Sequence, residues 1–345
     1  MIIDNYVIDS NSPVFIIAEL SANHNGNLKT ALETVRAAKR AGANCIKLQT
    51  YTADTLTIDS DKDDFMIKGT IWEGKNYYQL YQEAYTPWEW HSEIMKVAEE
   101  EGLICFSSPF DPTSVDFLES LNVPAYKIAS FEITDIPLIE YVASKGKPII
   151  ISTGIATIED IELALDACHR MGNFDIALLK CTSSYPAPIE EANMCMVKDL
   201  AERFNVITGL SDHTIGATVP VVATCFGAKI IEKHFILDHS IGGPDASFSM
   251  DEKEFSEMVK AVREAEKAIG VVDYTLTDKQ VKGRNFSRSL YVVEDIKEGD
   301  IITKDNVRSI RPGFGLHPKF YPQILDKNSK RDIKKGEPIS FTDLS

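Results

Sequence analysis

Eight short apolar segments recur along most of the chain, and each is followed by a segment with helical periodicity. The short segments are apolar on both faces, which is typical of parallel strands buried beneath helices. The helical segments, such as residues 28–42, repeat apolar side chains at three- and four-residue spacing and end in glycine. Eight regular pairs favour an α/β fold, a closed (β/α)8 TIM barrel, over an open doubly wound sheet. The predicted strands are residues 14–20, 44–50, 103–108, 125–130, 148–153, 176–182, 206–211 and 229–235.

The pattern changes near residue 270. A barrel needs about 250 residues, and this chain has 345. After residue 283 the sequence consists of short β-type pieces and turns, and the near repeat of DIKEGD in DIKKGE predicts paired turns. We therefore predict a barrel domain at residues 1–270, a linker at 271–282 and a small β-rich domain at 283–345. Inside the barrel, the segment 51–86 is longer than an ordinary βα loop, which is typical of a lid or a substrate wall.

The overall charge and the cysteines limit the class of protein. A formal net charge of -16 argues against nucleic acid or an anionic membrane as the main partner. No apolar stretch approaches the roughly 20 residues of a membrane span, and the first residues do not resemble a signal peptide. The six cysteines include no CxxC pair. We therefore expect reduced, buried thiols in a cytoplasmic protein rather than a disulfide or zinc framework.

Polar side chains gather where the predicted strands end, which is the active-site face of a barrel. Lys47 and Lys127 share this face with several serines, and such a set predicts a site for phosphate or carboxylate oxygens. A lysine that forms a Schiff base in an aldolase is an alternative that these residues alone leave open. The polar strand-end residues are Glu19, Lys47, Gln49, Ser107, Ser108, Lys127, Ser130, Glu132, Ser152, Ser183, Tyr185, His213 and His234.

His213 and His234 follow consecutive predicted strands, so they are expected to lie side by side. A single histidine in a barrel is more often a hydrogen-bonded core residue, but two at equal depth favour a metal site. Two protein ligands leave coordination positions open, which predicts a labile divalent cation, Mn²⁺ or Mg²⁺, with Co²⁺ as a further candidate. Asp212 is either a third ligand or the cap of the next helix.

Glu19 and Glu132 are the candidates for general acid and base, and the alternative is that they only form ion pairs with the nearby lysines. Tyr185 and Asp245 are candidates for contacts with sugar hydroxyls. Their structural alternatives are a loop-filling aromatic side chain and a turn residue.

Motifs along nearly the whole chain resemble the sialic acid synthase family. They are IAELSANHNG (17–26), IKLQTY (46–51), CFSSPF (105–110), YKIASFE (126–132), STGIAT (152–157), KCTSSYPAP (180–188), GLSDHTIG (209–216), IEKHF (231–235) and PDASFSMD (244–251). The tail, from RSLYVVEDIKEGD to SIRPGFGLHPK, resembles the family's antifreeze-like (SAF) domain. The resemblance implies a metal-dependent condensation of phosphoenolpyruvate with an open-chain amino-sugar aldehyde, which yields a nonulosonic acid and phosphate.

The resemblance also implies roles for individual residues. His213 and His234 would be the metal ligands, and Glu132 would lie by the metal and the reacting carbon. Phosphoenolpyruvate would be bound by Lys47, Gln49, Ser108, Lys127, Ser130, Ser152, Ser183 and Ser211, although the neuraminate branch has asparagine in place of Ser183. The amino sugar would be bound by Glu19, Tyr185 and Asp245, and by Phe286 and Arg311 of a second subunit. This last point implies a homodimer in which each SAF domain covers its partner's barrel; for Arg311, an ion pair that stabilises a turn is the alternative.

Within the family, the chain most resembles the branch that makes pseudaminic acid. The markers are SDKDDFMIKG followed by tryptophan in the long second loop, YKIASFE and RPGFGLHPKFY. Where neuraminate synthases typically read SGE, this chain has Ser130-Phe131-Glu132. Synthesis of neuraminate or legionaminate is the alternative within the family, and a non-catalytic sugar- or ice-binding protein is the alternative outside enzymes.

Overall fold

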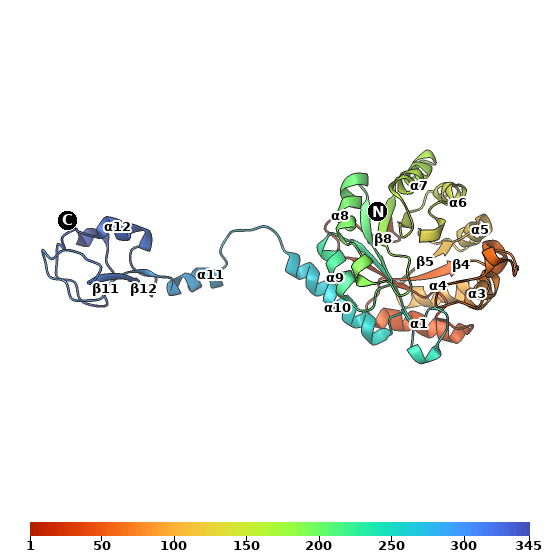
Figure 1. Ribbon diagram of the computed structural model, residues 1–345, viewed down its shortest axis with the longest axis horizontal. Helices are drawn as coiled ribbons and strands as arrows, with labels where there is room; N and C mark the ends of the chain where they lie inside the picture. The colour runs from red at the N-terminus through yellow and green to blue at the C-terminus, as the bar shows by residue number, and fades with distance from the viewer. The chain divides into compact units, whose positions relative to one another are not determined.

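The computed structural model describes residues 1–345. The chain forms two compact units, Met1–Gly270 and Val271–Ser345 (Figure 1). The first unit has two clusters of buried apolar side chains, and the second unit has its own. No helix of either unit is long and apolar enough to cross a membrane.

The first unit is a closed barrel of eight parallel strands, in the order β10-β3-β4-β5-β6-β7-β8-β9. Each strand falls within one of the eight segments predicted from the sequence, apart from one added residue at the ends of β5 and β9, so the predicted TIM barrel is confirmed. The strands are β3 (Phe15–Glu19), β4 (Cys45–Thr50), β5 (Ile104–Pro109), β6 (Tyr126–Ile128), β7 (Ile149–Ser152), β8 (Ile176–Cys181), β9 (Ile207–Asp212) and β10 (Ile230–His234).

Helices surround the barrel, as Figure 1 shows. Their apolar stripes pack on the outer faces of the strands, which is why these strands are apolar on both sides. The helices are α1 (Leu28–Arg40), α4 (His91–Glu100), α5 (Pro112–Ser120), α6 (Ile136–Ala143), α7 (Ile158–Arg170), α8 (Cys195–Phe204), α9 (Thr218–Cys225) and α10 (Glu252–Ile269). The expectation of buried thiols is wrong for Cys195 and Cys225, which are exposed because they lie at the ends of the outer helices α8 and α9.

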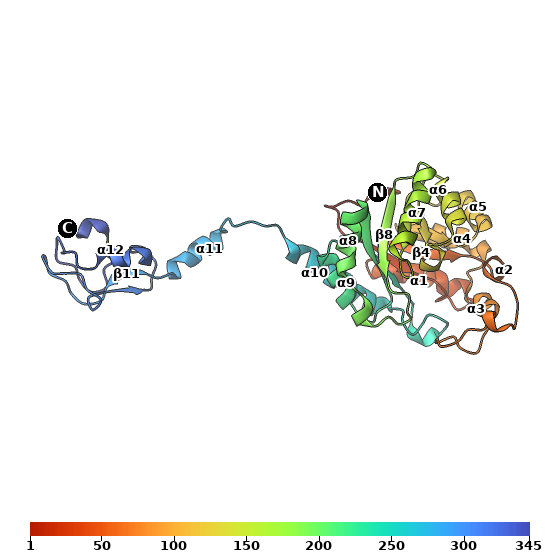
Figure 2. The same ribbon diagram turned by 45° about the horizontal axis from the view of Figure 1, so that its top comes forward.

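Two features of the first unit go beyond eight repeats. An unpredicted hairpin of β1 (Ile2–Ile3) and β2 (Tyr6–Val7) covers the amino-terminal ends of the strands, where Ile3 and Ile8 are fully buried. The long segment 51–86 contains α2 (Ala53–Leu56), a 3-10 turn (Asp63–Phe65) and α3 (Tyr77–Ala84). Figure 2 shows this segment in orange, with extended connections between its short helices.

The second unit has a small antiparallel sheet of β11 (Ser289–Val292) and β12 (Val307–Ile310), and the short helices α11 (Asp278–Gly283) and α12 (Tyr321–Ile324). The two near-identical turns pair with each other: Ile296 and Ile333 exchange backbone hydrogen bonds of 2.9 and 2.8 Å. On either side of this pair, Lys334 bonds to Asp295 at 2.8 Å and Lys297 to Asp332 at 2.9 Å. Helix α11, apart from its last residue, lies in the stretch 271–282 that was predicted to be a linker.

Candidate active site

The carboxyl ends of the barrel strands bring the predicted polar side chains together. Successive side chains of a strand point to opposite faces, so Lys47 and Gln49 both point inward, as do Glu232 and His234. Parallel pairing sets Glu19 beside Lys47 and, on the other side, beside His234. Most of these groups are buried, which means that water does not satisfy their charges.

Two lysines and two glutamates form one buried network at the centre of the mouth. Lys47 Nζ forms ion pairs with Glu19 and, at 3.1 Å, with Glu232, and it donates to Ser108 Oγ at 3.4 Å. Lys127 Nζ lies 3.8 Å from the same Glu232 carboxylate. The pKa of Lys47 falls to about 8, because burial and the charge of Lys127 together outweigh the opposing charge of Glu232. The four formal charges sum to zero.

Sequence reasoning missed Glu232. Burial alone would raise its pKa, but the charges of Lys127 and Lys47 hold that pKa below the usual range. Its position two residues before His234 on the same strand was the available signal, because this spacing places both side chains on one face.

The predicted serines line the barrel beside this network. Ser211 Oγ donates to Glu232 at 3.3 Å, and Ser130 Oγ accepts the backbone N–H of Gly154 at 3.1 Å. Ser152 Oγ and Ser183 Oγ are buried and have no hydrogen-bond partner within the protein. A Cβ atom at Gly154 would lie 2.1 Å from Ser183 Oγ, so this close approach requires glycine. Buried hydroxyls without partners next to two ammonium groups suit an anionic ligand.

His213 and His234 lie side by side, as their order in the sequence predicts, with ring centroids 5.3 Å apart. His213 Nδ1 is 2.9 Å from the carbonyl oxygen of Thr182, which leaves Nε2 free to act as a ligand. His234 Nδ1 is buried without a hydrogen bond and lies 3.7 Å from Asp245 Oδ2. Two imidazoles with open nitrogens beside carboxylates fit a divalent cation.

Asp212 is neither a metal ligand nor a helix cap, so both interpretations from the sequence are wrong. Its carboxylate accepts from Lys233 Nζ at 2.5 Å, and from the backbone N–H and the hydroxyl of Thr214. Asp212 and Lys233 point away from the barrel interior, because the inward positions of their strands belong to Ser211 and Glu232. They form a separate buried ion pair between barrel and helices.

A cavity of about 380 Å³ is lined in part by His234. Its polar wall includes the predicted Gln49, Glu132, Ser183, Tyr185 and Asp245. Its other wall is apolar and comes mainly from the segment 51–86, with Leu56, Ile67, Trp72, Tyr77, Leu80 and Tyr81. The predicted role of that segment as a substrate wall therefore agrees with its position.

Glu132 stands at the edge of this cavity. Burial raises the pKa of its carboxyl group to about 7, against the opposing charge of Lys127. Its Oε2 atom is buried and has no hydrogen-bond partner. A carboxyl group that titrates near neutral pH beside a cavity is suited to general acid–base chemistry.

Ser21 was not predicted, and it organises the polar wall. Its hydroxyl donates to Asp245 Oδ2 at 2.5 Å and accepts from Gln49 Nε2 at 3.0 Å. Gln49, predicted as a phosphoenolpyruvate ligand, is thereby connected to Asp245. Ser21 lies two residues after Glu19 in the motif SANHNG, at the same strand end.

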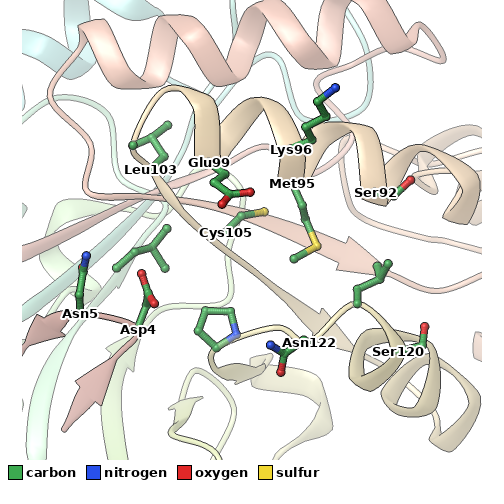
Figure 3. Close-up of a pocket in the computed structure, with 14 residues that line it drawn as sticks. Asp4, Asn5, Ser92, Met95, Lys96, Glu99, Leu103, Cys105, Ser120 and Asn122 are labelled. Atoms are coloured by element: carbon green, nitrogen blue, oxygen red, sulfur yellow. The ribbon is translucent and has the colours of Figure 1, made fainter.

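A larger cavity, of about 760 Å³, lies at the opposite end of the barrel (Figure 3). It is bounded by the turn of the amino-terminal hairpin and by α4, and Lys96, Glu99 and Asn122 stand around it. None of the predicted site residues lines it. Because active sites of these barrels occupy the carboxyl-terminal face, the smaller cavity is the candidate site.

Phe286 and Arg311 belong to the second unit. Both are exposed there, and the backbone of Gly313 donates to Asn285 at 3.0 Å, so the segments that carry them adjoin. Arg311 forms no ion pair within the chain, which contradicts its alternative role in stabilising a turn. Their contact with a sugar stays a prediction.

Sequence comparison identifies the family. The profile of the NeuB family matches residues 34–274. The chain belongs to the NeuB family. A SAF domain profile matches residues 287–345, so the resemblance of the tail is confirmed as well.

Relatives within the family differ in their similarity to the chain. The pseudaminic acid synthase of Campylobacter jejuni is 50% identical, over 97% of this chain and 98% of the relative. The N,N'-diacetyllegionaminic acid synthase of Legionella pneumophila is 35% identical, over 96% and 94%. Among solved structures, the spore coat polysaccharide biosynthesis protein SpsE of Bacillus subtilis superposes with a TM-score of 0.68, at 33% identity, covering 100% of this chain and 99% of that one.

Proposed function

We propose that the protein is a pseudaminic acid synthase. It condenses phosphoenolpyruvate, water and 2,4-diacetamido-2,4,6-trideoxy-β-L-altropyranose to pseudaminic acid and phosphate. The observation that carries this proposal is the junction of two sites: an anion site with Lys47 and Lys127 lies beside a cavity with one polar and one apolar wall. The similarity to pseudaminic acid synthases at 50% identity supports the choice of sugar.

The residues divide the reaction between them. Lys47, Lys127 and the serines hold the phosphate and carboxylate of phosphoenolpyruvate, so that its C3 carbon faces the aldehyde carbon of the sugar. As C3 forms the new C–C bond, the aldehyde oxygen gains the electron pair and then a proton. Glu132 orients a water for addition at C2 and takes up its proton. The resulting tetrahedral centre then expels phosphate by cleavage of the bond between C2 and the phosphate oxygen, and its hydroxyl proton leaves with the phosphate as the ketone forms. The proton taken up by Glu132 balances the one gained by the former aldehyde oxygen.

His213 and His234 would hold the divalent cation, Mn²⁺, Mg²⁺ or Co²⁺. When bound, the cation supplies Lewis-acid polarisation of the aldehyde oxygen. Two observations support this assignment: His234 Nδ1 is buried without a partner, and the formal charges of the lysine–glutamate network cancel. A multiply charged anion such as phosphoenolpyruvate therefore finds excess positive charge there only with the cation.

Removal of the metal is expected to weaken the binding of phosphoenolpyruvate itself. We expect the Kd from titration calorimetry to rise about tenfold or more after treatment with chelator, because the site then lacks the divalent positive charge that attracts the anionic ligand. Added Mn²⁺ should restore it. A His234→Ala variant should show the weak binding regardless of added metal. Equal Kd values with and without chelator would contradict the metal site.

A panel of three precursor sugars tests the substrate. With phosphoenolpyruvate in each assay, phosphate release is expected with 2,4-diacetamido-2,4,6-trideoxy-β-L-altropyranose at a kcat/KM at least about 100-fold above that for N-acetylmannosamine or the legionaminate precursor. Differences of this size follow when polar hydroxyls must face an apolar wall. A higher kcat/KM with either other sugar would reassign the protein within the family.

We also propose a homodimer in which the SAF unit of one chain covers the barrel mouth of the other. The proposal is supported by exposed apolar side chains on loops at the mouth, Phe131, Ile155 and Ile215, and by exposed Phe286 and Phe314 in the second unit. Exposed apolar groups of this kind mark interaction surfaces. A monomer in sedimentation equilibrium at micromolar concentration would contradict it.

A further inference from the structure

Trp72 connects two loops that line the cavity beside His234, where the proposed function places the amino sugar. It belongs to the segment 51–86, and its indole Nε1–H donates to the carbonyl oxygen of Pro244 at 3.0 Å. Its ring also lies against Tyr185 and Phe248, with centroids at 5.7 and 6.5 Å. Pro244 directly precedes Asp245, so the contact reaches the polar wall of the cavity.

The loop that receives this hydrogen bond, residues 236–250, is itself held firmly. Asn23 Nδ2 donates to the carbonyl oxygen of Phe235 at 3.0 Å and to Ser249 Oγ at 2.8 Å. Asn25 Nδ2 donates to the carbonyl oxygen of Ile241 at 3.0 Å. The loop 236–250 is therefore held by the loop between β3 and α1 and offers a fixed point of attachment.

The segment 51–86, in contrast, has one hydrogen bond to the loop 236–250, and that bond comes from Trp72. The same segment supplies most of the apolar wall of the cavity, including Ile67 and Leu80. The wall can close on a ligand only while the segment stays in place. Trp72 is thus placed to control how well the apolar wall is formed.

We propose that Trp72 fastens the segment 51–86 to the loop 236–250 beside the amino-sugar cavity and so selects a sugar with apolar substituents. This inference rests on the proposed function. The acetamido methyl groups and the deoxy carbon of the substrate are the substituents that gain from an apolar wall, because they leave water on binding. A fully hydroxylated sugar gains nothing there and loses hydrogen bonds to water. Trp72 acts here as a positioning residue for the wall.

The test uses the full-length enzyme with Trp72→Phe and Trp72→Ala. The phenylalanine variant keeps a ring but lacks the N–H donor, whereas the alanine variant lacks both. We expect the KM for the diacetamido sugar to rise about 3- to 10-fold in the first and about 30-fold or more in the second, with the KM for phosphoenolpyruvate within twofold. The ratio of kcat/KM for the diacetamido sugar to that for N-acetylmannosamine should fall in Trp72→Phe and fall further in Trp72→Ala. Ile58→Ala, at an exposed position of the same segment that does not line the cavity, should match wild type.

A second measurement does not depend on turnover. Trypsin should cleave the segment after the exposed Lys62 and Lys68 about tenfold faster in Trp72→Ala than in wild type or Ile58→Ala, since local opening governs such cleavage. Unchanged cleavage, or an unchanged KM for the sugar in Trp72→Ala, would overturn the inference. If wild type turns over neither sugar, the proposed function fails, and cleavage still decides whether Trp72 fastens the loop.

Discussion

Replacing Lys47 with methionine is expected to lower kcat/KM by about 10³-fold or more and to raise the Kd of phosphoenolpyruvate. The ammonium group is the donor closest to the centre of the network, and charge stabilisation in a site shielded from water has effects of this size. The free energy of unfolding should fall as well. Loss of one partner from a buried ion pair costs on the order of 3–5 kcal/mol, because Glu19 and Glu232 keep their charge without it.

The chain contains a matched control for this experiment. Lys233 is also buried and also pairs with a carboxylate, that of Asp212, but it points out of the barrel. Lys233→Met should lower the melting temperature by an amount similar to that of Lys47→Met. Its folded fraction should bind phosphoenolpyruvate as wild type does. Calorimetry and thermal melts of both variants separate the two effects, and similar loss of binding in both would remove Lys47 from the site.

Glu132→Gln is expected to reduce kcat by about 10²- to 10⁴-fold, the range for loss of a positioned base. In wild type the pKa of Glu132 is about 7, so kcat/KM should rise with pH through this value as the carboxylate forms. The residual activity of the variant should lack that rise. A pH–rate profile with the same step near 7 in the variant would show that another group provides the base.

The same substitution is expected to stabilise the protein at high pH. Burial raises the pKa of Glu132 from its ordinary 4.5 to about 7. Below pH 4.5 the carboxyl is protonated in both folded and unfolded chains. As pH rises from 4.5 to 7 the unfolded chain releases the proton first, so wild type loses stability; above 7 the loss levels off. At 1.36 kcal/mol per pKa unit this amounts to about 3 kcal/mol.

Glutamine has no proton to release, so Glu132→Gln should not show this loss. Urea unfolding of both proteins at pH 5 and pH 8 measures it. The variant should gain about 3 kcal/mol relative to wild type at pH 8 and much less at pH 5. Equal free energies of unfolding of the two proteins at pH 8 would contradict the raised pKa of Glu132. A residue that costs stability in this way is expected at a functional site.

Residues at strand ends were predictable because a barrel makes their positions equivalent. The order of the strands placed His213 beside His234 and put Lys47 and Lys127 on one face, and both pairs are found there. Glu232 was visible only as part of a strand, because its spacing from His234 was not used. Asp212 was misread, because its partner Lys233 faces it only across two paired strands.

No comparable sequence rule predicts contacts between loops. Trp72 and Pro244 are 172 positions apart in the chain, and no periodicity relates a residue in an irregular loop to a partner at that distance. The same applies to Ser21, whose hydroxyl connects Gln49 to Asp245. These contacts depend on how the loops fold over the barrel, which local sequence preferences do not specify.

Hydrophobic periodicity and strand order were enough to predict the barrel, the face with the polar side chains and the kinds of groups on it, because these local properties add up to one architecture. The charge balance of the site and the shape of the cavity beside His234 became visible only in the folded chain. Both arise from side chains brought together from distant segments: Glu19 and Glu232 neutralise the two lysines, and the segment 51–86 supplies most of the apolar wall. Burial then sets the pKa of Glu132, since desolvation exists only once the chain is folded.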